Sequence, residues 1–152
     1  SPLREVYAAA KSGLGVLGDN GLLITKEYGS FVFLGEIVTD LYIECDGEIK
    51  ECLHCGNCKK GCPKDTLGEC LSAVTQKKGE LSPAQKKAVK ENGSLWGCDI
   101  CQDNCPLNTT AKTTYVIEFI NGYKDRYEKG EDIKNRAFAW RGEKVILRNT
   151  DL

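Results

Sequence analysis

The 152-residue chain has a globular composition: 41% of its residues are hydrophobic, 28% are charged, and the formal net charge is −1. These values exclude an intrinsically disordered chain and give no sign of a protein that mainly neutralises nucleic-acid phosphates. No apolar stretch approaches the roughly 20 residues of a membrane-spanning helix, so no membrane partner is expected. The chain contains no methionine. This indicates a fragment of a longer protein, with loss of an initiator methionine as the alternative.

The part before the cysteine-rich region is expected to mix helix and strand. Residues 3–12 are rich in alanine and precede Gly13, which favours a helix with a glycine stop. A glycine-dense loop follows over residues 13–21, and a turn is predicted at 28–30. Apolar, β-branched and aromatic runs predict strands at residues 22–25 and 31–38, with 41–44 extending the sheet.

Eight of the nine cysteines form a pattern typical of two [4Fe–4S] clusters. Residues 52–63 carry C-x2-C-x2-C-x3-C-P, and residues 98–106 carry the same run without its first cysteine, which Cys70 can supply. In two-cluster proteins the last cysteine of the run binds the other cluster. The predicted ligand sets are therefore Cys52, Cys55, Cys58 and Cys105 for one cluster, and Cys62, Cys70, Cys98 and Cys101 for the other.

Zinc is the main alternative, because two four-cysteine zinc sites would also use eight cysteines. Zinc, however, has no reason to require the x3-C-P ending twice. The ninth cysteine, Cys45, lies in a predicted strand and is expected to be a small core residue. His54 lies between two predicted ligands; it is either a surface histidine or a hydrogen-bond donor to a cluster sulfur. Thiolates that bind metal need a reducing compartment, so a cytoplasmic location is expected.

The remainder of the chain is expected to be helical. A serine–proline pair at 82–83 begins a short helix that Gly93 ends. Apolar spacing predicts further helix over 113–129 and over 133–148, with an interruption near Gly142. The fold class is therefore α+β, with a small sheet segment, a bacterial-ferredoxin-like double-cluster module that has little apolar core of its own, and C-terminal helices. The corresponding segments are residues 1–50, 51–110 and 111–152.

Five stretches together resemble the C-terminal part of the epoxyqueuosine reductase family. They are GLGVLGDNGLLI (13–24), EYGSFVFLGEIVTDL (27–41), CLHCGNCKKGCP (52–63), CDICQDNCPLN (98–108) and AFAWRGEKVILRN (137–149). Many ferredoxins share the cysteine motifs, whereas the glycine-rich and YGS stretches make the resemblance specific.

The resemblance implies a cobalamin-dependent, oxygen-sensitive iron–sulfur oxidoreductase that reduces an epoxide in the last step of queuosine synthesis in tRNA. It implies electron transfer through two [4Fe–4S] clusters, supplied by a low-potential donor of the ferredoxin or flavodoxin type. It also implies that small residues of the glycine loop and the following turn face the corrinoid, namely Gly18, Asn20, Gly21, Gly29, Ser30 and Phe31. A glycine-rich turn without a ligand is the alternative for this loop.

The sequence also departs from the family. Members usually carry Gly-Lys-Asn where this chain has Gly18-Asp19-Asn20. The carboxylate thought to protonate substrate lies upstream of the segment that matches residues 1–5, so no catalytic residue is assigned. The helical repeats that help to bind tRNA follow the segment that matches 137–149, so tRNA is expected to bind through other regions. Two other functions stay open: a stand-alone ferredoxin-type carrier, and a related corrinoid reductase that acts on organohalogens.

Overall fold

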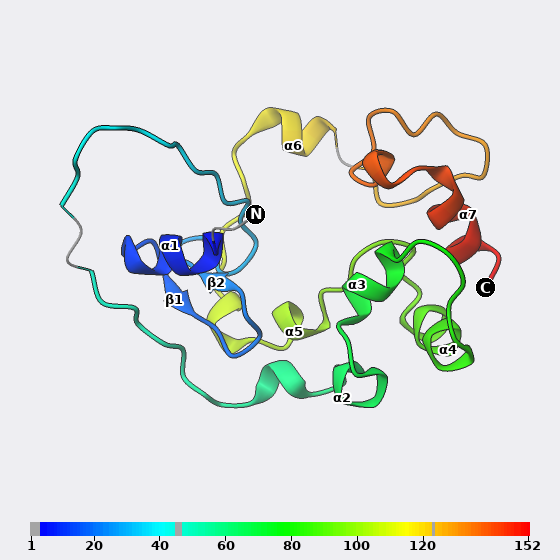
Figure 1. The fold of residues 1–152 in the computed structure, drawn as a ribbon, viewed down its shortest axis with the longest axis horizontal. Helices are drawn as coiled ribbons and strands as arrows, with labels where there is room; N and C mark the ends of the chain where they lie inside the picture. Colours follow the sequence, from blue (N-terminus) through cyan, green and yellow to red (C-terminus); the bar gives the residue numbers. More distant parts are fainter. Residues whose placement is uncertain (1–3, 45–46, 123) are drawn as a thin grey trace. The chain divides into compact units, whose positions relative to one another are not determined.

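The computed structural model describes residues 4–44, 47–122 and 124–152, and the chain divides into two compact units (Figure 1). Unit 1 comprises Ser1–Lys60 and Ile100–Asn121, and unit 2 comprises Gly61–Asp99 and Gly122–Leu152. Each unit therefore combines two segments that are far apart in the sequence. Cys45, which was expected in the core, lies outside the described residues.

Unit 1 contains the small sheet. Its elements are α1 (Glu5–Lys11), β1 (Val16–Leu17), β2 (Leu23–Ile24), α5 (Ile100–Asp103) and α6 (Ile117–Asn121), with 3-10 turns η1 (Asn57–Lys59) and η2 (Pro106–Asn108). Strands β1 and β2 are antiparallel. Helix α1 buries Ala9 and Ala10 against Leu23 of β2, which forms the core of the unit. The predicted helix at 3–12 and strand at 22–25 are confirmed, except that Leu3 lies outside the described residues.

Strand β1 also holds the start of the first cysteine run. The amide of Leu17 donates to the carbonyl of Lys50 (2.8 Å), and the amide of Cys52 donates to the carbonyl of Leu17 (3.1 Å). The segment that enters the cysteine run therefore continues the sheet for one bridge, between Leu17 and Glu51. This contact fixes the backbone of Cys52 on the rigid core of unit 1.

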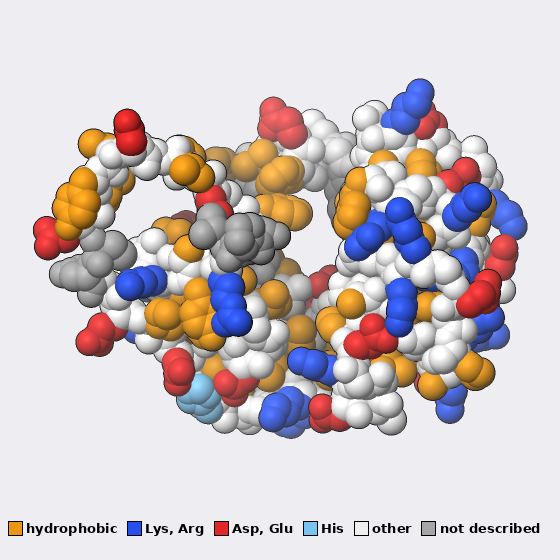
Figure 2. Space-filling view, viewed as in Figure 1, with side chains coloured by type: hydrophobic (Ala, Val, Ile, Leu, Met, Phe, Trp, Pro, Cys, Tyr) orange, Lys and Arg blue, Asp and Glu red, His pale blue; other side chains and the backbone are white. Residues whose placement is uncertain are grey.

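The strand predictions at 31–38 and 41–44 are wrong for this chain. Both segments are irregular, and no backbone–backbone hydrogen bond with another described residue is recorded for residues 32–44. The side chains of Phe33, Ile37 and Val38 are about nine-tenths exposed, at 91%, 93% and 89%. Figure 2 shows apolar side chains along the corresponding arch of chain. A strand forms only beside another strand, and none of the described backbone lies in that position.

Unit 2 is helical. Its elements are α2 (Lys64–Leu67), α3 (Leu71–Gln76), α4 (Pro83–Asn92), the 3-10 turn η3 (Ala139–Arg141) and α7 (Glu143–Thr150). As predicted, Ser82 caps α4, in a capping box with Gln85, and Gly93 ends the helix in the left-handed conformation (φ 70°). The apolar core of unit 2 consists of Leu71, Val74, Leu81 and Val89. The expectation that the cysteine-rich region has little apolar core is therefore wrong for residues 71–89.

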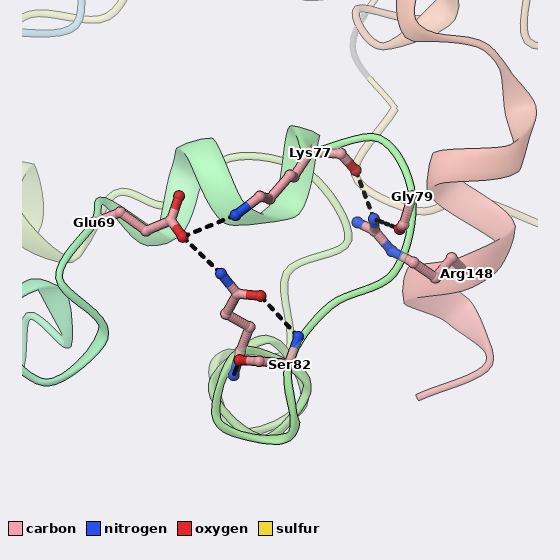
Figure 3. Close-up of polar contacts among 6 residues, drawn as sticks. Glu69, Lys77, Gly79, Ser82 and Arg148 are labelled. Atoms are coloured by element: carbon pink, nitrogen blue, oxygen red, sulfur yellow. Dashed lines mark hydrogen bonds and ion pairs between the residues drawn. The ribbon is translucent and has the colours of Figure 1, made fainter.

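Polar side chains tie the loops of unit 2 together (Figure 3). The guanidinium of Arg148 on α7 donates to the carbonyls of Lys77 (2.5 Å) and Gly79 (2.8 Å), and partial burial lowers its pKa. The carboxylate of Glu69 accepts from the Lys77 ammonium (3.1 Å) and the Gln85 amide (2.6 Å). These contacts fix the residue just before Cys70 and the loop between α3 and α4.

The other helices are shorter than predicted. In place of a helix over 113–129, the structure has only α6, and Tyr123 lies outside the described residues. In place of one over 133–148, it has η3 and α7, separated at Gly142 (φ 86°), near the predicted interruption. Glycine in a helix interior has high conformational entropy to lose, which explains the breaks at 122 and 142. No helix in the described ranges has the length and apolar character that would let it span a membrane.

Candidate metal centre

Cysteines from both runs line one pocket in unit 1. They are Cys52, Cys55, Cys58 and Cys105, the four residues predicted to bind one cluster. Cys105 is the buried member of the set, at 9% exposed. The glycine-loop residues Gly18, Asp19 and Asn20 line the same pocket. The fold thus gathers this predicted ligand set within one compact unit, while ligation itself stays a prediction.

The sulfur atoms of the pocket are not arranged as around a single zinc ion. With Zn–S bonds of about 2.3 Å, tetrahedral zinc brings its ligand sulfurs to within about 3.8 Å of one another. In the described part of the chain, the one group of three potential ligands within 4.8 Å of one another is Asp19, Cys52 and His54. No three of the pocket cysteines bring their sulfurs that close together in the structure. No disulfide joins the eight cysteines that the structure describes.

Asn20 supplies a second indication that the pocket holds a polar group. Its side-chain oxygen accepts a hydrogen bond from the Leu22 amide (3.2 Å). Its side-chain nitrogen is buried and has no hydrogen-bond partner among the described residues. A buried donor without an acceptor is costly and calls for an explanation. Inorganic sulfide or cysteine sulfur of a cluster would supply the acceptor.

His54 joins the first cysteine run to the glycine loop. Its Nδ1 lies 2.8 Å from a carboxylate oxygen of Asp19, and its Nε2 lies 3.1 Å from one of Glu51. The hydrogen bond with Asp19 is the main cause that raises the pKa of the His54 imidazole. Both ring nitrogens are thus engaged with carboxylates, which favours the surface-histidine interpretation over donation to sulfur. Burial, and then the charge of Asp19, raises the pKa of the Cys58 thiol.

Asn108 fixes the end of the second cysteine run against the turn at 28–30. Its side-chain oxygen accepts from the Ser30 amide (2.9 Å), and its nitrogen donates to the Ser30 hydroxyl (2.8 Å) and the Gln102 carbonyl (2.8 Å). Gly29 lies so close that a Cβ there would be 2.3 Å from the Asn108 side-chain oxygen, at a φ of 57°. Cys105 precedes Asn108 by three residues. The contacts of Asn108 with the turn at 28–30 therefore help to position the segment that carries Cys105.

The six residues expected to face a corrinoid do not gather around one surface. Gly18 and Asn20 line the cysteine pocket. Ser30 is 7% exposed and, like Gly29, packs against Asn108. Phe31 lines a different hollow, together with residues near α6. Gly21 occupies a tight turn with positive φ (81°). Their contact with a corrinoid stays a prediction.

The second predicted ligand set is divided between the units. Cys62, Cys70 and Cys98 belong to unit 2, and Cys101 belongs to unit 1. Cys70 is exposed and occupies the N-cap position of α3. The assignment of these four residues to one cluster rests on the motif alone.

Sequence reasoning did not find three of the features that shape this centre: the pairing of Asp19 with His54, the bridge made by Asn108, and the unpartnered nitrogen of Asn20. The two contacts that Asn108 makes with Ser30 join residues 78 positions apart. A single asparagine so far in sequence from its partner forms no recognisable sequence motif. The only available signal was that Asp19 and Asn20 lie in the glycine loop already singled out.

Known proteins similar to this chain are epoxyqueuosine reductases. No family model matches the chain. The epoxyqueuosine reductase of Lactococcus garvieae is 36% identical over 97% of this chain and 47% of that protein. The solved epoxyqueuosine reductase of Streptococcus thermophilus superimposes with a TM-score of 0.72 and 32% identity, over 95% of this chain and 43% of that one.

A further crystal structure contains an epoxyqueuosine reductase with an epoxyqueuosine-modified tRNA-Tyr stem loop. It superimposes with a TM-score of 0.76 and 30% identity, over 95% of this chain and 44% of the solved chain. This chain thus spans about half the length of the relatives that it matches. Sequence and fold agree over almost all of this chain's own residues, and the chain therefore matches the C-terminal part of epoxyqueuosine reductases.

Proposed function

We propose that this chain carries two [4Fe–4S] clusters and forms the electron-transfer part of a cobalamin-dependent, epoxyqueuosine-reductase-like enzyme of queuosine modification in tRNA. The observation that carries the proposal is the pocket in which Cys52, Cys55 and Cys58 meet Cys105 from the other run. When bound, a [4Fe–4S] cluster supplies reversible one-electron transfer at a potential set by burial and by hydrogen bonds to sulfur.

The chain's own residues would hold and orient such a group. The backbone bridge from Leu17 fixes Cys52, and Asn108 fixes the segment that carries Cys105. The buried amide nitrogen of Asn20 offers a hydrogen bond that would favour the more negative, reduced state. Cys62, Cys70, Cys98 and Cys101 would hold the second cluster. Segments 1–50, 51–110 and 111–152 would then be a corrinoid-facing part, the cluster module and a helical part.

Similarity to epoxyqueuosine reductases supports the reductase over a stand-alone ferredoxin. An electron carrier of the ferredoxin type needs only the cysteine segment, yet the similarity to epoxyqueuosine reductases covers 97% of the chain. It therefore includes the glycine loop and the turn at 28–30. Reduction of a tRNA-borne epoxide, the tRNA partner and a cytoplasmic location belong to this proposal, because the chain covers about half of each relative. A corrinoid, bound beside Gly18 and Asn20, would supply the chemistry at the epoxide.

The surface around Cys70 suits an acidic electron donor. Cys70 is exposed and lines a shallow hollow with Lys77, Lys78 and Arg141. Basic groups beside an exposed ligand attract an acidic partner and speed its association. A ferredoxin- or flavodoxin-type donor would approach unit 2 here. Its rate of electron delivery should fall steeply as ionic strength rises.

Corrinoid binding tests the reductase proposal directly. The anaerobically reconstituted chain is mixed with cobalamin, alone and together with the unmatched part of the Lactococcus garvieae relative. We expect cobalt to co-elute with the protein and the cobalamin absorption spectrum to change, and Gly18→Leu to weaken both effects. If cobalamin associates with neither preparation although the iron content is full, the chain is an electron carrier and not part of a corrinoid enzyme.

A further inference from the structure

Asp19 is the charged residue of the glycine loop, and it lies at the wall of the cysteine pocket. The loop closes in a tight turn, in which the Gly21 amide donates to the Gly18 carbonyl (2.8 Å). This turn joins the paired strands β1 and β2, so Asp19 and Asn20 lie at the end of a hairpin. Both residues line the cysteine pocket. The hairpin therefore fixes the backbone of Asp19 beside the predicted cluster ligands.

The side chain of Asp19 is held close to a ligand sulfur. A carboxylate oxygen of Asp19, a ring nitrogen of His54 and the sulfur of Cys52 all lie within 4.8 Å of one another. The Nδ1 atom of His54 lies 2.8 Å from the carboxylate, and the Asp19 side chain is 31% exposed. Contact with the imidazole thus keeps the carboxylate against the first cysteine run.

The group formed by Asp19, His54 and Glu51 carries net negative charge. Its two carboxylates contact one imidazole, at 2.8 Å and 3.1 Å. With both carboxylates ionised, the group is negative whether or not the imidazole carries a proton. The charge of Asp19 also reaches the cysteines, since after burial it is the next cause of the raised pKa of the Cys58 thiol. The same field disfavours any further negative charge in the pocket.

We propose that Asp19 lowers the reduction potential of the cluster assigned to the cysteine pocket, here called the pocket cluster. This inference rests on the proposed function, because it requires that cluster to be bound. Reduction transfers one electron from a low-potential donor and makes the bound group more negative, without forming or breaking a covalent bond. A carboxylate close to the ligand sulfurs opposes this change, and net charge is one of the quantities that set such potentials.

Two neighbouring side chains therefore act on the potential in opposite directions. The buried amide nitrogen of Asn20 favours the reduced state, whereas the carboxylate of Asp19 disfavours it. A cluster of lower potential passes its electron to an acceptor more readily. Asp19 thus favours delivery of the electron over its retention.

Redox titration of the anaerobically reconstituted chain, followed by electron paramagnetic resonance, tests this inference. The signal that Cys105→Ser removes identifies the pocket cluster. Asp19→Asn keeps an oxygen that can accept the His54 hydrogen bond but removes the charge. At a fixed solution potential, the ratio of reduced to oxidised pocket cluster should therefore rise at least about threefold. Asp19→Glu keeps the charge and should change this ratio much less.

Glu51→Gln is the matched control. It removes an equal charge from the same imidazole, but Glu51 is 66% exposed and is not among the residues that line the pocket. Its effect on the ratio should be smaller than that of Asp19→Asn, because more water separates its charge from the ligand sulfurs.

Three results would overturn the inference. One is an unchanged potential in Asp19→Asn, and another is an equal rise in Asp19→Asn and in either Asp19→Glu or Glu51→Gln. The third is loss of the pocket cluster from both Asp19 variants, because the residue would then hold the cluster and not set its potential. Iron and sulfide are counted in every sample. Full content without a difference in potential contradicts this inference alone, whereas absence of iron from the unaltered chain contradicts the proposed function and the role of Asp19 with it.

Discussion

The cysteine pocket and the exposed segment of residues 32–44 belong to the same compact unit but differ in the contacts that they make. Around the pocket, contacts reach across the sequence: Cys52 to Leu17, His54 to Asp19, and Asn108 to Ser30. Residues 32–44 have the composition of a strand, but no strand of the described residues lies beside them. The difference teaches that unit 1 brings the four predicted ligands of one cluster together, whereas the apolar side chains of residues 32–44 stay largely uncovered by the described residues.

The largest expected effect is on the pocket. Cys105→Ser should remove the cluster held by Cys52, Cys55 and Cys58, and so lower the iron content by about four atoms per molecule. The serine hydroxyl is a poorer ligand than a thiolate for this group. Iron analysis and electron paramagnetic resonance of the reduced, reconstituted variant would measure the loss.

Cys101→Ser is the matched comparison, because it lies in the same run but is assigned to the other cluster. The two variants should each keep one cluster, with different spectra. If Cys105→Ser loses the same cluster as Cys101→Ser, the crossed ligation is wrong.

Removal of metal should destabilise the cysteine loops but leave the helical core of unit 2 folded. Chelation under anaerobic conditions should raise hydrogen exchange at residues 52–62, whose order depends on ligation. Helix α4 should keep its protection, because Val89 packs with Leu71 and Val74 without any metal. Equal loss of protection in both segments would show that the apolar core does not stand alone.

Loss of the Asn108 side chain should lower the free energy of unfolding more than loss of the side chain of its exposed neighbour, Thr109. Asn108→Ala removes three hydrogen bonds and leaves the buried Ser30 amide unpaired, which should lower the free energy of unfolding by about 1–3 kcal/mol. Thr109→Ala is the control, because Thr109 is exposed and bonds only within its own turn, and it should change stability by less than about 0.5 kcal/mol. Denaturant unfolding measures both; equal effects would remove the special role of Asn108.

Asn20 should affect the potential of the cluster more than the stability of the fold. Asn20→Leu keeps the branched shape of the side chain and removes the buried donor, so the reduced state loses a hydrogen bond and the midpoint potential should become more negative. Redox titration followed by electron paramagnetic resonance measures the shift. The control is Asn121→Leu on α6, outside the residues that line the pocket. No difference between the variants would mean that Asn20 does not contact the cluster.

The smallest effect is expected in the exposed segment of residues 32–44. Ile37→Thr should change the free energy of unfolding by no more than about 0.5 kcal/mol, because the side chain is 93% exposed. A large loss of stability in the isolated chain would show that Ile37 is already buried there, and the contrast with the pocket would disappear.

Local patterns predicted the parts of this molecule whose causes are local. The serine at 82 and the glycine at 93 delimit α4 because capping depends on residues a few positions apart. Cysteine spacing grouped the residues of the pocket because short loops fix the direction of each thiol. The strand at 31–38 failed although its composition favours it, since pairing depends on a neighbour that composition does not reveal. The contact between Ser30 and Asn108 could not be predicted because 78 positions separate the two residues.

The most direct measurement is a count of iron, sulfide, zinc and cobalt per chain after anaerobic reconstitution, with the visible spectrum recorded on the same sample. Two [4Fe–4S] clusters predict about eight irons and eight sulfides per molecule, and a broad absorption that bleaches on reduction. Two zinc ions per molecule with negligible iron, or no more than about four irons after full reconstitution, would contradict the two-cluster account.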